Sequence, residues 1–435
     1  MTKLPIKPGR LIETIHSTAK WGAKGTWGPE TTQTGVCRLS LSDLDKSVRD
    51  WFVSETTALG CNVKIDEMGN IFAIYPGKHN DRPPIGIGSH LDTQPNGGRY
   101  DGILGVLSAL EVLRTMKENN YVPNYPIAAI DWTNEEGARF PISMVSSGVW
   151  AEKISLAEGL NLKSLDKVPV SIDDELKRIG YKGDVKASYK ENPLAAHFEL
   201  HIEQGPILEN EKKKIGVVTG VQAFEWNLVT VTGRSSHAGT TPMNSRSDAI
   251  LIASRIINMA VDIATNKKGV ATVGTLELEP SSVNVIPNIV KFSLDVRHVS
   301  DEGLKEIMTE IKQKAEQIAH ENINSKLAKP LTVDFKNLTV SPAINFNKTN
   351  VNTVRESALE LFGEDGIREI VSGAGHDSCY TSSRVPTSMI FIPSKDGVSH
   401  TPEEYSTPEE VENGFKVLLN TVLKYDEMRA NGLVE

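Results

Sequence analysis

Residues 85–120, IGIGSHLDTQPNGGRYDGILGVLSALEVLRTMKENN, pass from a short apolar segment through a polar, glycine-rich loop into a second apolar segment. The segment Ile85–Ser89 predicts a short buried strand. Apolar residues after the loop recur at helical spacing: Ile103, Leu104, Leu107, Leu110 and Leu113. Asp101 stands where the N-cap of that helix could be. A strand followed by a loop and a helix is the repeating unit of a parallel α/β sheet.

The same rhythm continues on both sides of this stretch. Asn62–Ile65 and Ile71–Tyr75 predict strands around a tight turn, Ile127–Thr133 predicts a buried strand, and Ser388–Ser394 returns to that style. These segments favour an α/β fold whose sheet is mostly parallel and carries helices on both faces. In such sheets, functional groups gather beyond the carboxyl ends of the strands.

The middle of the chain has a different pattern. Strands are predicted at Glu225–Thr232, Val270–Leu278, Ile289–Arg297 and Leu331–Phe335, and helices at Asp248–Thr265 and Glu302–Asn322. Several strands with two helices make a compact α+β unit. We therefore expect a discontinuous larger domain, residues 1–220 with 340–435, interrupted by a smaller inserted domain at residues 221–339.

The composition is that of a folded globular protein: of 435 residues, 39% are hydrophobic and 24% charged. The net charge of −9 argues against nucleic-acid binding, which requires clustered Lys and Arg. Three cysteines without CxxC spacing, Cys37, Cys61 and Cys379, indicate a reducing compartment. The N-terminus lacks the apolar run of a signal peptide, and no apolar stretch approaches the roughly 20 residues that span a bilayer. We expect a cytoplasmic protein with neither a nucleic-acid nor a membrane partner.

Side chains that suit metal ions gather in five motifs. These are SHLDTQPNGGRYDG with His90, Asp92 and Asp101; TNEEGARF with Glu135 and Glu136; ELHIEQGP with Glu199, His201, Glu203 and Gln204; SGAGHDS with His376 and Asp377; and KDGVSHTPEE with His400. His90 and Asp92 follow a strand two residues apart, so Asp92 could orient the imidazole, as ligating histidines require. A carboxylate such as Asp101 can bridge two ions about 3.5–4 Å apart.

Each of these residues also has an ordinary structural interpretation. Asp92 could cap a turn, Asp101 could be a helix N-cap, and the adjacent Glu135 and Glu136 could be a solvated pair. His201 and His400 could be a core histidine bonded to backbone and a loop histidine. The order along the chain, H-x-D, DG, EE, HIEQGP and a late GVSH, is what favours one shared metal centre.

A longer set of motifs resembles a known family. The motifs are SHLDTQPNGGRYDGILGV, NEEGARF, HFELHIEQGPILE, HAGTTPM, VNVIPN, DVRH, SGAGHDS and FIPSKDGVSH. Together they resemble the M20-type metallopeptidase-like amidohydrolases, and within them the branch that hydrolyses N-carbamoyl amino acids. The resemblance implies two divalent ions per subunit, Zn²⁺ or else Mn²⁺, Co²⁺ or Ni²⁺. Asp101 would bridge them, with His90 and His201 on one ion and Glu136 and His400 on the other.

The resemblance also implies individual roles. Glu135 would be the general base, and Asp92 would orient His90. His237, in GRSSHAGTTPM, would stabilise the oxyanion in a neighbouring subunit's site, which implies a homodimer; its structural alternative is to cap the following turn. The implied substrate-binding residues are Arg297, a fork for the carboxylate, Asn284, its amide partner, and Gln204 and His376, which line the ureido end. The inserted domain would then serve dimerisation and act as a lid.

Within this branch, the motifs resemble those of the fungal β-alanine synthases (β-ureidopropionases). This implies hydrolysis of N-carbamoyl-β-alanine to β-alanine, carbon dioxide and ammonia in reductive pyrimidine catabolism. The alternatives within the same fold are an N-carbamoyl-L-amino acid hydrolase, an allantoate or ureidoglycolate amidohydrolase, and an aminopeptidase or dipeptidase. A metal-free binding protein is an alternative of another class. Without the family resemblance, Arg297 would be interpreted as a surface charge at the end of a strand.

Overall fold

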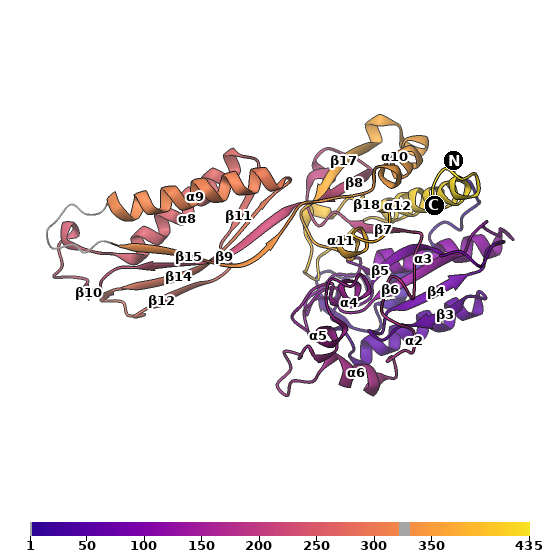
Figure 1. Cartoon of the computed structure of the whole chain (residues 1–435), viewed down its shortest axis with the longest axis horizontal. Coiled ribbons are helices and arrows are strands. Elements are labelled where there is room, and N and C mark those ends of the chain that lie inside the picture. The colour runs from indigo at the N-terminus through magenta and orange to yellow at the C-terminus, as the bar shows by residue number, and fades with distance from the viewer. Residues whose placement is uncertain (1, 322–330) are drawn as a thin grey trace. The chain divides into compact units, whose positions relative to one another are not determined.

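The computed structural model describes residues 2–321 and 331–435, which divide into two compact units. The larger comprises residues up to Gly220 together with Phe346–Glu435, and the smaller comprises Val221–Asn345 (Figure 1). The smaller unit extends past the expected residue 339. The reason is its last strand, which ends at Ser341 rather than at Phe335.

A nine-stranded sheet forms the centre of the larger unit, in the order β16-β8-β18-β7-β5-β6-β4-β3, with β17 beside β8. The strands are β3 (Asn62–Ile65), β4 (Ile71–Tyr75), β5 (Ile85–His90), β6 (Ile127–Trp132), β7 (Ala196–Ile202), β8 (Ile215–Val221), β16 (Ile344–Asn345), β17 (Ile367–Ser372) and β18 (Thr387–Ile392). The central strands β18, β7, β5 and β6 are parallel, whereas β8, β4 and β3 join antiparallel. The α/β fold is confirmed, and the parallel character belongs to the sheet's centre.

Helices cover both faces of this sheet (Figure 1). The α-helices of the larger unit are α1 (Arg10–Thr18), α2 (Asp43–Ala58), α3 (Ile103–Glu118), α4 (Val145–Trp150), α5 (Leu156–Asn161), α6 (Ile172–Ile179), α7 (Ile207–Asn210), α10 (Lys348–Phe362), α11 (Ser378–Thr381) and α12 (Pro408–Ala430). A hairpin of β1 (Ala23–Thr26) and β2 (Thr34–Val36) lies apart from the sheet. Successive side chains of strand β7 contact helices on opposite faces of the sheet. Phe198 packs on Tyr425 of α12, while the next residue, Glu199, accepts hydrogen bonds from Ser378 of α11.

The loop before α3 excludes one of the two interpretations of Asp101, that of a helix N-cap. The helix begins at Ile103, and its N-cap is Gly102, with φ of 67° and no side-chain capping bond. A Cβ at Gly102 would lie 2.3 Å from the His90 ring. Glycine has no Cβ, so the backbone can adopt a positive φ here and pass close to the His90 imidazole. The carboxylate of Asp101 faces the histidines described below instead of capping the helix.

The smaller unit is a five-stranded sheet, in the order β11-β14-β9-β15 with β12 also beside β14. Its elements are β9 (Ala223–Thr232), β11 (Val270–Thr272), β12 (Leu276–Glu279), β14 (Ile289–His298), β15 (Thr332–Ser341), a separate pair of β10 (Ser236–His237) and β13 (Val285–Ile286), α8 (Ala249–Asn266) and α9 (Asp301–Glu321). The strand expected at 270–278 is split because the backbone N–H groups of Gly274 and Thr275 bond to Ser293 Oγ. The expected end of α9 at Asn322 lies outside the described residues.

Among the described helices, α8 is the one that is long and apolar enough to cross a membrane by length and composition. Ile252, Ile256 and Ile263 of α8 are buried in the core of the smaller unit, while Arg255 and Asp262 are exposed on the other side. An apolar stripe opposite a charged one is the pattern of an amphipathic helix covering a sheet.

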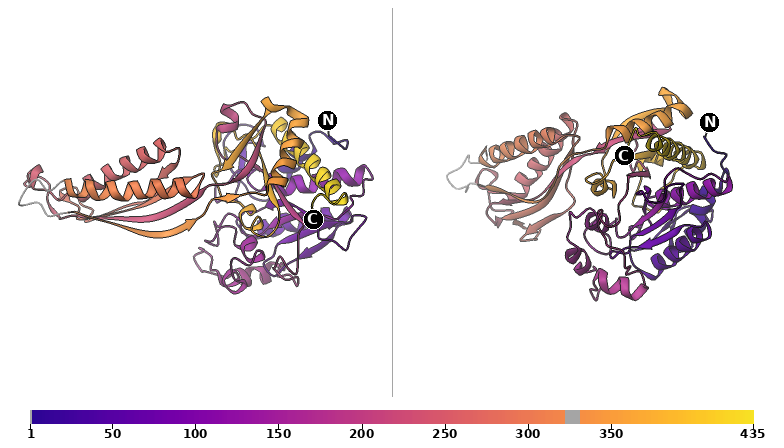
Figure 2. Two further views of the ribbon diagram at one scale, coloured as in Figure 1. Left: turned by 45° about the horizontal axis from the view of Figure 1, so that its top comes forward. Right: turned by 45° about the vertical axis from the view of Figure 1, so that its right-hand side comes forward.

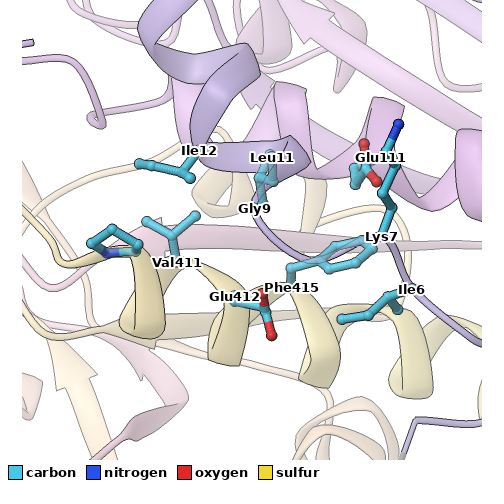
Figure 3. Close-up of a pocket in the computed structure, with 10 residues that line it drawn as sticks. Ile6, Lys7, Gly9, Leu11, Ile12, Glu111, Val411, Glu412 and Phe415 are labelled. Atoms are coloured by element: carbon cyan, nitrogen blue, oxygen red, sulfur yellow. The ribbon is translucent and has the colours of Figure 1, made fainter.

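A crevice lies between α1, α3 and α12, lined by Leu11, Glu111, Val411 and Phe415 among others (Figure 3). Its volume is about 10 Å³, which is room for about one water molecule. This crevice is a packing gap and does not accommodate a substrate.

Candidate metal centre and active site

Three parallel strands bring the principal side chains together. His90 is the last residue of β5, His201 lies near the end of β7, and Glu135 and Glu136 follow β6. Because β6, β5 and β7 are adjacent and parallel, their carboxyl ends meet at one edge of the sheet. His400, in the loop after β18, reaches the same edge.

Asp101 lies at the centre of this group. Its Oδ1 is 3.5 Å from His90 Nε2 and 3.1 Å from His201 Nε2. Its Oδ2 is 3.2 Å from His400 Nε2, which in turn is 3.5 Å from Glu136 Oε2. The two oxygens therefore belong to two different clusters, each compact enough for one metal ion. This arrangement suits a bridging carboxylate.

The two buried histidines turn their Nε2 atoms toward Asp101. His90 Nδ1 is 2.9 Å from the carbonyl oxygen of Asp92, and His201 Nδ1 is 2.9 Å from that of Ile202. Ligating histidines usually anchor the second nitrogen in this way. Buried His90 Nε2 has no hydrogen-bond partner within the described chain. A divalent ion would satisfy that atom, so the residues fit a metal.

Asp92 acts differently from the sequence-based expectation. It holds His90 through its backbone carbonyl, and its carboxylate oxygen is 4.0 Å from that imidazole. The carboxylate instead accepts the backbone N–H groups of Glu135 at 3.2 Å and Glu136 at 3.3 Å. Asp92 therefore connects the loop after β5 to the loop that carries the two glutamates.

The electrostatics of the centre favour a cation. Burial raises the pKa of Glu135 well above its usual range, and nearby carboxylates add to the shift. Burial and the charge of Asp101 likewise raise the pKa of Glu136 to about 7. The hydrogen bond to Asp101 raises the pKa of His400 to about 9. Crowded carboxylates that resist ionisation are stabilised when a divalent ion supplies positive charge.

Glu135 stands beside the metal clusters rather than in them. Its Oε2 is 3.4 Å from His90 Nε2, and only 9% of its side chain is exposed. Neither of the two clusters around Asp101 includes it. Its position next to the centre, together with a raised pKa, is the arrangement expected of a general base.

Two supporting residues were not singled out from the sequence. Gln94 donates to Glu136 through its backbone N–H, at 3.1 Å, and its Nε2, at 2.7 Å. Glu404 accepts the N–H groups of Tyr100 and Asp101, both at 3.0 Å, and the hydroxyl of Ser399 at 2.8 Å. Gln94 lies in the motif SHLDTQPNGGRYDG and Glu404 in the motif KDGVSHTPEE, each four residues from a candidate metal ligand. This short separation in the sequence is the feature that could have identified them.

Gln204 and His376 also lie at the centre. Gln204 Nε2 donates to Asp101 Oδ2 at 2.8 Å, and the His376 ring packs edge-on against His201, with centroids 4.5 Å apart. His376, His201 and Glu199 form a third compact cluster. Both oxygens of Glu199 are already bonded, to Ser89 Oγ and to Ser378.

His237, Asn284 and Arg297 lie in the smaller unit. His237 and Asn284 are neighbours, because β10 pairs with β13 and the carbonyl of Asn284 accepts the N–H of Ala238. His237 Nδ1 accepts the N–H of Gly239 at 3.0 Å, so it does cap the turn after it. Its Nε2 is the nitrogen that could act on a substrate.

Arg297 belongs to another part of the smaller unit. It lies near the end of β14, opposite Phe224 of β9 and Val270 of β11. Its guanidinium pairs with Asp295, Nη2 to Oδ2 at 2.7 Å. Figure 1 shows β10 and β11 at opposite ends of this unit. The structure therefore separates Arg297 from His237 and Asn284 within one chain.

Comparison with known proteins agrees with this fold. The sequence profile of Peptidase family M20/M25/M40 matches residues 86–424. An N-carbamoyl-L-amino-acid amidohydrolase of Rhizobium meliloti is 39% identical over 425 residues, 97% of each chain. A ureidoglycolate hydrolase of Arabidopsis thaliana is 35% identical over 397 residues, 89% of this chain and 82% of that one. The crystal structure of an amidase of the hydantoinase/carbamoylase family from Burkholderia multivorans has a TM-score of 0.89 at 43% identity, covering 97% of this chain and 98% of that one.

The chain belongs to Peptidase family M20/M25/M40, whose members are metal-dependent. It is a hydrolase, and its relatives support the carbamoylase branch of the family.

The expectation of N-carbamoyl-β-alanine as substrate, and with it a role in pyrimidine catabolism, is wrong. Among the relatives are N-carbamoyl-L-amino-acid amidohydrolases and ureidoglycolate hydrolases. They match the alternative prediction of an N-carbamoyl-L-amino acid hydrolase or a ureidoglycolate amidohydrolase. The motifs on which the expectation rested surround the metal clusters and the ureido end. They do not distinguish an α-amino acid from a β-amino acid at the other end of the substrate.

Proposed function

We propose that this protein hydrolyses N-carbamoyl-L-α-amino acids with two divalent ions bridged by Asp101. The observation that carries the proposal is the division of the two Asp101 oxygens between the His90–His201 cluster and the Glu136–His400 cluster. The names of the relatives supply the substrate class. Zinc suits this set of imidazole and carboxylate ligands, with manganese, cobalt or nickel as alternatives.

The reaction adds water to the ureido carbonyl and breaks its bond to the amino-acid nitrogen. The products are carbamate, which decomposes to carbon dioxide and ammonia, and the free amino acid. Divalent ions held by Asp101, His90, His201, Glu136 and His400 would lower the pKa of the attacking water and polarise the carbonyl. Glu135 takes the proton from the attacking water and delivers a proton to the leaving nitrogen. Gln204 and His376 line the place where the ureido group would lie.

The smaller unit supports a homodimer with sites shared between subunits. From Ile289 to Arg297 β14 advances eight residues, or about 26 Å at roughly 3.3 Å per residue. His237 lies beyond the Ile289 end, since Ser235 Oγ bonds to Asn288. An N-carbamoyl α-amino acid spans only a few ångströms, so His237 and Arg297 of one chain cannot bind the same molecule. If both contact substrate, they come from different copies.

Co-expression of two inactive variants tests this division. We expect His237→Ala and Arg297→Ala each to abolish most turnover, and a purified heterodimer of the two to regain about half of wild-type turnover, because one of its two sites is intact. Differently tagged subunits allow the heterodimer to be isolated and assayed. No recovery in a verified heterodimer would mean that both residues serve one subunit's site.

A substrate panel on metal-loaded protein tests the proposed activity. We expect hydrolysis of N-carbamoyl-L-α-amino acids to exceed that of N-carbamoyl-β-alanine, allantoate and a dipeptide, with release of ammonia and the amino acid. Ureidoglycolate belongs in the panel because ureidoglycolate hydrolases are among the relatives. Preference for ureidoglycolate would select that second function, and cleavage of the dipeptide alone would refute the carbamoyl activity.

A cytoplasmic location remains part of the proposal. Cys37, Cys61 and Cys379 are all free cysteines in the structure. Unpaired thiols are typical of proteins in reducing compartments.

A further inference from the structure

The sheet of the smaller unit has one helix-covered face and one open face. Helices α8 and α9 cover the first, and neither crosses to the second among the described residues (Figures 1 and 2). On β14, alternate side chains such as Phe292 and Val296 are buried under these helices, whereas Asp295 and Arg297 point the other way. Because side chains alternate along a strand, Arg297 lies on the open face.

Aromatic side chains occupy the same open face beside Arg297. Phe224 of β9 is directly opposite Arg297, and Trp226 is opposite Asp295. Directly opposed residues of antiparallel strands share a face. The guanidinium carbon of Arg297 lies 5.6 Å from the Phe224 ring centroid, and the Phe224 and Trp226 rings are 5.2 Å apart. We call Phe224 and Trp226 the aromatic pair.

The aromatic pair is not part of the core of the smaller unit. Trp226 is 41% exposed, and Phe224 is half-buried. Leu228 continues the row along β9 and is also only half-buried. An indole left this exposed contributes little to folding but offers a large, rigid apolar surface for contact. The adjacent Arg297 guanidinium, which is paired with Asp295 in this structure, adds a cationic group beside this apolar surface.

We propose that the aromatic pair recognises the side chain of the substrate and selects N-carbamoyl-L-α-amino acids with aromatic or large aliphatic side chains. This inference rests on the proposed function and on Arg297 as the carboxylate fork. In an α-amino acid, the carboxylate and the side chain share one carbon atom. A carboxylate bound at Arg297 therefore places the side chain within a few ångströms of the pair. N-carbamoylglycine has no side chain to place there, and ureidoglycolate has only a hydroxyl.

Selectivity between two substrates measures this contact. We expect wild-type kcat/KM for N-carbamoyl-L-phenylalanine to exceed that for N-carbamoylglycine, and Trp226→Ala to lower the ratio of the two values by about tenfold. Trp226→Phe should retain most of the selectivity, because it preserves an aromatic face. Leu276→Ala is the matched control, since Leu276 is 50% exposed and pairs with Phe292, on the helix side of the same sheet.

The possible results distinguish the role of the aromatic pair from the proposed hydrolase activity. An unchanged ratio in Trp226→Ala, or an equal loss on both substrates, would overturn the role of the aromatic pair while leaving the hydrolase activity intact. A ratio lowered as much by Leu276→Ala would also overturn it. Absence of turnover of every carbamoyl compound by the metal-loaded wild type would instead refute the proposed function itself.

Discussion

Replacing Glu135 by glutamine is expected to lower kcat by about 10²–10⁴-fold while the protein keeps its full metal content. The amide has nearly the shape of the carboxylate but cannot accept the proton of the attacking water. Glu135 lies 3.4 Å from His90 and outside the two clusters that share Asp101, so its replacement removes no proposed ligand. Turnover of an N-carbamoyl-L-amino acid and metal content by mass spectrometry are the two measurements.

Glu191→Gln is the matched control for this variant, because Glu191 is exposed on the same unit. The control should behave as the wild type in both measurements. Near-normal turnover of Glu135→Gln would remove Glu135 from the role of base. A parallel loss of metal would make it a ligand instead.

Asp101→Asn is expected to weaken metal binding by more than about 100-fold, because second-shell changes alone cost about 10–100-fold. The substitution removes the negative charge that faces His90, His201 and His400. It also replaces one oxygen with an NH₂ group, which cannot bind a cation. Turnover should fall with the metal content, and excess metal should restore little of it.

Equilibrium dialysis with Zn²⁺ measures this effect independently of activity. Asp184→Asn serves as the control, since Asp184 is exposed in the same unit. Circular dichroism establishes that the variant is folded. Two tightly bound ions in a folded Asp101→Asn protein would contradict the bridging assignment.

Much of the larger unit could be predicted from sequence, because its strands are short apolar segments with clear ends. Strands β3 and β4 have the predicted bounds, and β5 extends one residue further, to His90. Polar residues directly after buried strands then indicated where the centre forms. The structural alternative for Asp101, an N-cap of the following helix, does not hold, because Gly102 with its positive φ is the N-cap instead.

Other features depend on contacts between segments that are distant in the sequence, and these features are harder to predict from a sequence pattern. Glu404 supports Asp101 from more than 300 positions away in the chain, and a sequence pattern does not reveal such a pairing. Strand β14 was expected, but its register against β9 and β11, which separates Arg297 from His237, was not. The aromatic pair likewise could not be identified from the sequence, because only the pairing of β9 with β14 places it beside Arg297.

Anomalous X-ray scattering from crystals of zinc-loaded protein would locate the metal ions relative to Asp101. We expect two peaks about 3.5–4 Å apart on either side of the Asp101 carboxylate. One peak should lie against His90 and His201, and the other against Glu136 and His400. A single peak, or peaks away from Asp101, would contradict the two-metal centre.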